Sequence, residues 1–152
     1  MESSFILFEK DFNKLKRKIL EIKKNNKEVN IIYSGEDDDF NRLVLEKAEI
    51  NFLMINLLKR RDFSNQRNSG FNQVFAKIAK KRNISIGINF DEIIRSNEKD
   101  KILSRIMQNI KLCNKNKIKM KFFYSKDNLR DSYDFKALGF ALGMPTWMTK
   151  EL

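Results

Sequence analysis

A run of carboxylates directly follows one predicted strand, and a single carboxylate directly follows another predicted strand. The run is residues 36–39, and the single acid is Asp91. Parallel sheets place their functional sites at the carboxyl ends of strands, so Glu36, Asp37 and Asp91 could hold a hard cation or serve as a general acid and base. The alternative is that Asp37 or Asp38 caps one helix, that Asp91 caps another, and that the remaining acids of the run interact favourably with the helix dipole. Neighbouring acids point in different directions around a helix, which favours capping.

The chain contains no histidine and only one cysteine, Cys113. Without histidine, Ser–His–Asp triads, histidine-ligated zinc and most proton shuttles near neutral pH are excluded. A single cysteine excludes an internal disulfide and a multi-cysteine metal site, and it is typical of a reducing compartment. The five glycines fit neither the dinucleotide fingerprint nor the Walker loop. Beyond the carboxylates, the sequence offers no catalytic set, and we expect no metal or cofactor bound by the protein.

Positive charge dominates the composition. Lysine and arginine number 31 against 20 acidic residues, which gives a net charge of +11 and an isoelectric point of about 9.8. Such an excess favours a polyanionic partner. The longest polar connection, residues 59–70, carries Lys59, Arg60, Arg61 and Arg67 among amide and hydroxyl side chains. Phosphate contact is one use for such a loop, and a flexible solvated loop is the alternative.

The elements that must position these residues follow a simple pattern. Short apolar runs rich in β-branched and aromatic residues alternate with amphipathic stretches, which predicts repeated βα units and a mainly parallel sheet. We expect strands over residues 29–34, 51–57, 84–90 and 119–124, with residues 5–8 as a candidate fifth. Helices are expected over residues 9–25, 37–47, 70–82, 98–116 and 132–142. The length and the lack of a linker indicate one α/β domain over residues 1–152.

Three of these helices have clear apolar stripes, and in helix 9–25 the stripe is Phe12, Leu15, Ile19 and Ile22. The inward residues expected in helix 70–82 are Phe71, Val74, Phe75 and Ile78. Those expected in helix 98–116 are Ile102, Leu103, Ile106, Met107, Ile110 and Cys113. This spacing makes Cys113 a small core residue rather than a nucleophile. The opposite face of the same helix holds Lys101, Arg105, Gln108 and Leu112. A leucine beside cations indicates either a contact surface for protein or RNA, or an isolated surface leucine.

The helix over residues 132–142 is apolar on two flanks. One flank carries Tyr133, Ala137, Phe140 and Ala141, and the other carries Phe135, Leu138 and Leu142. The sheet can cover only one flank, so something else must cover the second. The candidates are the segment after Pro145, which contains Trp147, and a partner protein.

The apolar runs at residues 5–8 and 52–58 are too short for a secretion signal or a membrane span. We therefore expect a cytoplasmic protein without membrane contact.

Four stretches, taken in order, resemble the archaeal and eukaryotic protein component 3 family of ribonuclease P. The first is residues 33–42, a glycine and acidic run that ends in Asn-Arg after a strand. The second is residues 61–79, a basic loop followed by Gly-x-Asn-x-Val. The others are residues 105–113 and the part of residues 125–144 that runs through Leu-Arg to Gly-Met. Together they span about residues 31–144, and they agree in order and spacing.

The resemblance implies a TIM-barrel-like protein subunit of an RNA-based endonuclease that removes the 5′ leader from precursor tRNA. In that family the RNA and its bound Mg²⁺ perform the hydrolysis, so the protein is not an enzyme by itself. It works with a small RNA-binding partner protein and meets precursor tRNA only indirectly. Four or five strands are too few to close an eight-stranded barrel. Either further strands complete the barrel, or it stays partial and a partner covers it.

The same resemblance implies functional residues. For RNA binding they are Arg42, Arg61, Arg67, Arg105, Lys111 and Arg130. For the protein partner, we expect contact with the flank of helix 132–142 that carries Phe135, Leu138 and Leu142. Asn41 and Asn72 are expected to be structural, and an ion pair with Asp131 or Asp134 is an alternative for Arg130. Two other functions stay open: a small metal-dependent phosphoester hydrolase that uses Glu36, Asp37 and Asp91, and an interaction scaffold with no RNA role.

Overall fold

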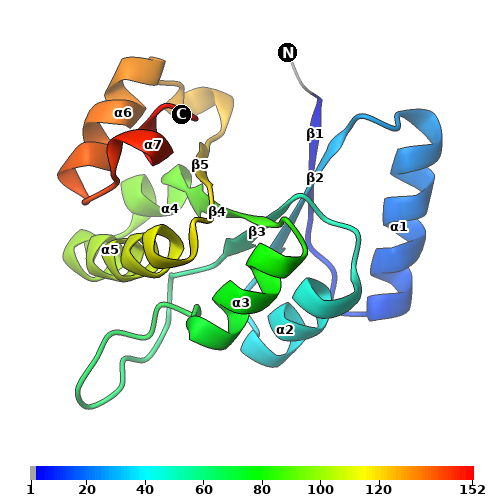
Figure 1. Cartoon of the computed structure of the whole chain (residues 1–152), viewed down its shortest axis with the longest axis horizontal. Helices are drawn as coiled ribbons and strands as arrows, with labels where there is room; N and C mark the ends of the chain where they lie inside the picture. Colours follow the sequence, from blue (N-terminus) through cyan, green and yellow to red (C-terminus); the bar gives the residue numbers. More distant parts are fainter. Residues whose placement is uncertain (1–2) are drawn as a thin grey trace.

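Five strands form one parallel sheet in the computed structural model, which describes residues 3–152. They are β1 (Ser4–Leu7), β2 (Asn30–Gly35), β3 (Phe52–Ile55), β4 (Ser85–Asn89) and β5 (Met120–Phe123). The strands pair in chain order, each parallel to the next. This is the order of a TIM barrel, and the sheet curls into a half-barrel (Figure 1). The predicted α/β class, parallel sheet and partial barrel are confirmed, including the candidate strand at residues 5–8.

Helices alternate with these strands. They are α1 (Phe12–Asn25), α2 (Asp38–Lys47), α3 (Gln73–Lys81), α4 (Phe90–Arg95), α5 (Lys99–Asn116), α6 (Ser132–Ala141) and α7 (Thr146–Thr149), with a 3₁₀ turn at Lys126–Asn128. Asp11, Asp37 and Asn72 fix three of the starts, because each side chain accepts a hydrogen bond from the backbone N–H three residues later. Across the described residues, no helix is long and apolar enough to cross a membrane.

The main core lies between the sheet and its helices. Alternate strand residues point to opposite faces of a sheet. The residues on the helix side are Ile31, Tyr33, Leu53, Ile55, Ile86, Ile88, Met120 and Phe122. Ile32, Ser34 and Met54 alternate with these, so they lie on the inner side of the curl, where they are also buried.

The helix stripes are only partly as predicted. Ile102, Ile106, Ile110 and Cys113 are buried, so Cys113 is a core residue. Val74 and Met107, expected inward, are exposed. In α3 the helix begins at Gln73, and Phe75, Ala76 and Ala79 fill the buried face instead of Val74.

One flank of α6 is covered from within the chain. The last helix, α7, packs beside α6 at the end of the chain (Figure 1). Contact is close at Gly139, where a Cβ atom would lie 2.9 Å from the Met144 sulfur and 3.1 Å from Leu152. The segment after Pro145 therefore covers the Gly139 side of α6, while the flank with Tyr133 and Phe140 stays exposed.

Candidate RNA interface

The candidate interface is built on the connection between β3 and α3, which we call the β3–α3 loop (residues 56–72). It extends away from the body of the molecule (Figure 1). The backbone is left-handed at Lys59 and again at Gly70, with φ of 59° and 67°. A side chain is tolerated at Lys59 at a cost of about 1–3 kcal/mol. It is not tolerated at Gly70, where a Cβ would lie 2.5 Å from the Arg60 guanidinium and 2.7 Å from Ile55.

Two buried charged side chains hold the base of this loop. Glu92 of α4 accepts the Leu57 N–H at 3.0 Å, and Arg105 of α5 donates from Nη1 to the Leu57 carbonyl at 2.9 Å. Arg105 also donates from Nη2 to the Arg60 carbonyl at 2.9 Å. Burial raises the pKa of the Glu92 carboxyl, although the backbone N–H of Leu57 opposes the shift.

The structure corrects the expected position of Arg105. It is not on an outward face: only 3% of the residue is exposed, and its donors are used inside the protein. A buried guanidinium needs such partners, because an unpaired charge in the interior is costly. Arg105 therefore positions the β3–α3 loop and does not present its charge to a partner.

Within the loop itself, Asp62 accepts more hydrogen bonds than any other side chain does. Its carboxylate accepts hydrogen bonds from Arg67 Nη1 at 2.7 Å, from the Asn68 N–H at 2.9 Å and from Arg105 Nη2 at 2.9 Å. These donors, Arg67 first, hold the pKa of Asp62 well below its usual range, and the same pairing raises the pKa of Arg67. These hydrogen bonds favour an ordered loop over the flexible solvated segment that the sequence left open.

A second cation, Arg60, also works inside the loop. Its side chain is largely buried, donating to the Asn56 carbonyl at 2.7 Å and to Asp38 at 3.0 Å. The most exposed cations of the loop are Lys59 and Arg61, whereas Arg67, whose side chain is 40% exposed, is paired with Asp62. In the chain from residue 3 onward, neither of these two side chains has an ion-pair partner.

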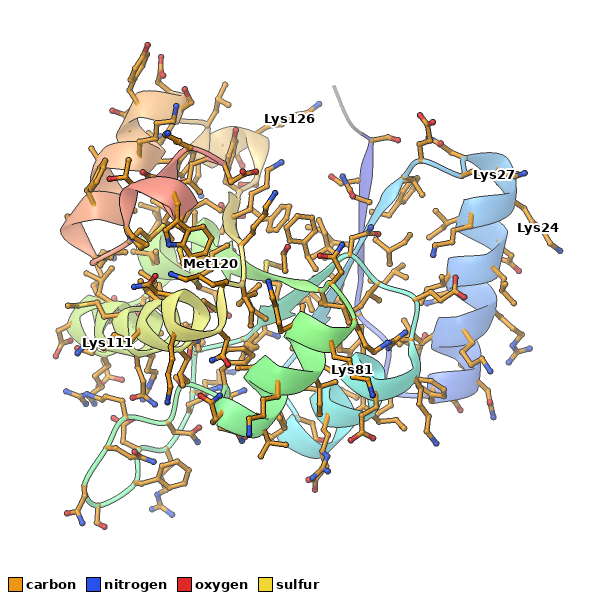
Figure 2. All side chains as sticks on the ribbon, viewed as in Figure 1. Lys24, Lys27, Lys81, Lys111, Met120 and Lys126 are labelled. Carbon is orange, nitrogen blue, oxygen red and sulfur yellow. The ribbon has the colours of Figure 1, made fainter. Side chains whose placement is uncertain are left out.

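The remaining sequence-predicted cations lie at the surface, but on separate elements. Arg42 of α2 is paired with Glu46 at 2.9 Å. Lys111 projects from α5 (Figure 2). Arg130 precedes α6, and its guanidinium lies 5.8 Å from the centre of the Phe90 ring. Arg130 forms no ion pair with Asp131 or Asp134 within the described part of the chain.

Lysines are spread widely over the molecule. Lys24 lies on α1 and Lys27 in the turn that follows it, both far from Lys111 in the view of Figure 2, and Lys81 stands on α3 between them. The number of lysines alone therefore does not mark a binding face. The β3–α3 loop differs from these scattered lysines, because buried hydrogen bonds hold its backbone and its exposed cations therefore have defined positions.

The residues predicted to contact a protein partner face the core. Phe135 is 6% exposed and packs among Phe90, Phe122 and Tyr124, with ring centres 5.2, 5.2 and 4.8 Å away. Leu142 is also buried, and Leu138 is partly buried against the core. The flank chosen from the sequence is therefore wrong for surface contact. The exposed flank of α6 is the one with Tyr133 and Phe140.

The carboxylates after the strands have separate tasks. Asp37 caps α2 by accepting the Phe40 N–H at 2.7 Å, as predicted, whereas exposed Glu36 lies 3.4 Å from Lys10. Asp91 does not cap a helix: it accepts Ser125 N–H at 3.0 Å and Asn128 Nδ2 at 2.7 Å. Burial alone would raise the pKa of Asp91, but these hydrogen bonds outweigh it and lower the pKa.

These acids do not form one site. Glu36 follows β2 and Asp91 follows β4, and β3 lies between those strands. A cavity of about 590 Å³ at the end of β2 is lined by Phe8, Tyr33 and Glu36, among others, but not by Asp91. Within residues 3–152, no group of three or more cysteine, aspartate and glutamate side chains is arranged to hold a metal ion.

Two expectations about asparagines are confirmed. Asn72 caps α3, and Asn41 is buried with its Nδ2 3.4 Å from the Gly35 carbonyl. One exposed residue of the β3–α3 loop, Phe63, was not singled out from the sequence. The available signal was a lone aromatic in a polar loop.

Fold and site together define a parallel α/β half-barrel that displays a preorganised basic loop. The chain superimposes over 98% of its length on a chain in the cryo-EM structure of archaeal ribonuclease P with mature tRNA. The TM-score is 0.80 and the sequence identity is 23%, so the two chains share their fold. This chain covers 63% of the length of that one. Neither a known protein family nor a curated protein matches the sequence.

Proposed function

We propose that this chain is a non-catalytic protein subunit of ribonuclease P, the ribonucleoprotein that removes the 5′ leader from precursor tRNA. The observation that carries the proposal is the fold shared with a chain of archaeal ribonuclease P across almost the whole molecule. The sequence resemblance, found on residues 31–144, points independently to the same complex. The net charge of +11 supports an RNA partner.

In this role the protein neutralises phosphates of the catalytic RNA. The surface cations Lys59 and Arg61 of the β3–α3 loop make the central contacts, and Arg42, Lys111 and Arg130 extend them. Arg67 and Arg105 act indirectly, because their charges are paired with Asp62 and keep the loop in shape. Each neutralised phosphate releases counterions, so it adds roughly 0.7–0.9 to the slope of log affinity against log salt, if values for DNA carry over.

Bond cleavage belongs, in this proposal, to the RNA and its Mg²⁺, while the protein stabilises the folded RNA. The protein binds this RNA together with a small RNA-binding partner protein. Its contact with precursor tRNA is indirect, through the catalytic RNA. The complex works in the cytoplasm. The separate tasks of Glu36, Asp37 and Asp91 support a non-catalytic role over a phosphoester hydrolase.

The experiment that tests the proposal is purification of the full chain from its own cells, followed by sequencing of any bound RNA. We expect one structured RNA, and the purified material should mature the 5′ end of precursor tRNA. Protein that is free of nucleic acid and of processing activity would contradict the proposal. As a second arm, the isolated protein is incubated with Mg²⁺ or Mn²⁺ and a phosphodiester substrate. Turnover that Glu36→Gln abolishes would favour the hydrolase.

A further inference from the structure

Phe63 occupies the tip of the β3–α3 loop. It is 58% exposed, and the turn there is closed by a hydrogen bond from the Phe63 N–H to the Gln66 carbonyl at 3.0 Å. In the described part of the chain, its ring packs against no other aromatic ring and no cation. The residues between, Ser64 and Asn65, are polar and exposed. A phenyl ring in this position adds nothing to the core.

The backbone on both sides of this ring is held in place. Asp62, directly before Phe63, is bonded to Arg67, Asn68 and Arg105. Arg105 is itself anchored in the buried face of α5. A buried guanidinium and a network of hydrogen bonds thus fix the shape of residues 59–68, a segment whose single apolar side chain is the exposed Phe63. A preorganised group loses less conformational freedom when it binds a ligand.

We propose that Phe63 is a stacking platform for an unpaired base of the bound RNA, with Arg61 on a neighbouring phosphate. This rests on the proposed function and adds a ligand class to it: single-stranded nucleotides in a loop or bulge, in addition to duplex backbone. Unpaired bases stack on exposed aromatic rings, and a cation beside the ring contacts the backbone. Asn65 and Gln66, two and three residues after Phe63, are exposed, and their amides can hydrogen-bond to base edges.

An exposed phenylalanine can also be a contact site for another protein. Three features favour RNA. Apart from the Arg67–Asp62 ion pair, the surface charges of the loop are the cations Lys59 and Arg61. The polar residues at its tip carry a hydroxyl and amides. Phe63 is a single aromatic with no exposed aliphatic side chain among residues 59–68. Protein interfaces use larger clusters of apolar residues around such an anchor.

The test compares the full chain with Phe63→Ala, Phe63→Trp and Phe140→Ala. Phe140 is the matched control, because it is 54% exposed but lies on α6. The probes are a short single-stranded RNA of mixed sequence that carries 2-aminopurine, and an RNA duplex of the same length. Affinity and its salt dependence are measured by fluorescence, and circular dichroism checks that each variant is folded.

We expect Phe63→Ala to bind the single strand roughly 5- to 150-fold more weakly, the range covered by one base stacked on one aromatic ring. The salt slope should not change, since no charge is lost, and duplex binding should stay as in the wild type. Phe63→Trp should restore affinity and the quenching of 2-aminopurine. Phe140→Ala should behave as the wild type.

Equal affinity of wild type and Phe63→Ala for the single strand, with salt-dependent RNA binding intact, would overturn the stacking role and leave the proposed function standing. An equal loss on single strand and duplex would also overturn it, because the effect would then not be stacking. Wild-type protein that binds neither probe at any salt concentration would overturn both.

Discussion

Arg105 and Asp62, 43 residues apart in the sequence, are joined by two hydrogen bonds: Nη2 and Nε of the guanidinium lie 2.9 and 3.2 Å from the same carboxylate oxygen. This contact ties the middle of α5 to the β3–α3 loop. The same guanidinium holds the carbonyl groups of Leu57 and Arg60. One side chain therefore fixes the loop at three points, and the shape of the candidate interface depends on it.

Replacement of Arg105 by alanine should destabilise the protein strongly. The change leaves two backbone carbonyls without their donor and removes a charge partner of Asp62. Removing one partner of a buried ion pair costs about 3–5 kcal/mol. The free energy of unfolding, measured in urea, checks this, and Lys111→Ala on the exposed side of the same helix is the control. A loss below about 0.5 kcal/mol, typical of surface changes, would contradict this role of Arg105.

The stability of the protein should fall in acid through Asp62. The pKa of its carboxyl is lower in the folded protein than the ordinary value of 3.8. Folding is therefore favoured when Asp62 is charged, and this contribution is fully present above pH 3.8 and is lost as pH falls through the lower, folded pKa. Asp62→Asn should flatten the dependence of the unfolding free energy on pH in that acid range. If wild type and Asp62→Asn lost unfolding free energy equally as pH falls, the pairing with Arg67 and Arg105 would not lower the pKa of Asp62.

Glu92 should have the opposite dependence on pH. Burial raises the pKa of its carboxyl above the ordinary 4.5, so the folded protein holds that proton more firmly than the unfolded chain does. As pH rises from 4.5 through the folded pKa, this group makes folding less favourable. Glu92→Gln keeps an oxygen for the Leu57 N–H but carries no charge. We expect it to match the wild type in acid and to be at least as stable at neutral pH, as measured by urea unfolding. A less stable variant at neutral pH would contradict this account.

The sequence predicts the strands well because their signals are local. Runs such as residues 29–34 are rich in β-branched apolar residues, here Val29, Ile31 and Ile32, as strands of a parallel sheet buried on both faces are. The exception is α4, since residues 84–90 look like one continuous strand. In the structure Asn89 accepts the N–H of Asp91, which ends β4, and the helix begins at Phe90. An asparagine that caps a helix cannot be distinguished, from its residue type, from an asparagine in a turn after a strand, so the sequence did not predict α4.

The site was less predictable because its contacts are distant in sequence. Helical periodicity places Arg105 away from the apolar stripe, but it cannot show that Asp62, 43 residues away, buries that flank. The two flanks of α6 are similarly apolar, so the sequence does not say which one faces the sheet. The aromatic cluster around Phe135 decides this, and its members come from α4, β5 and the residue after β5.

Alanine substitutions should separate the two flanks of α6. Phe135→Ala empties a site enclosed by three aromatic rings, and such a change costs about 3–5 kcal/mol. Phe140→Ala removes an exposed ring and should change the unfolding free energy by about 0.5 kcal/mol or less. Thermal or urea unfolding of both variants measures the difference. Equal losses would mean that the exposed flank is also packed in solution.

The proposed RNA contact of Arg61 can be distinguished from the general effect of positive charge. Arg61 is an exposed cation of the β3–α3 loop, and Lys24 is a cation on α1, on another side of the molecule (Figure 2). Arg61→Ala should weaken binding to a ribonuclease P RNA transcript and reduce the slope of log affinity against log salt by roughly 0.7–0.9, the contribution of one phosphate. Lys24→Ala removes the same charge and should leave that slope unchanged. Because neither residue supports the fold, the unfolding free energy should stay within about 0.5 kcal/mol of the wild type in both variants. Equal reductions of the slope in the two variants would mean that net charge, and not the β3–α3 loop, governs the interaction.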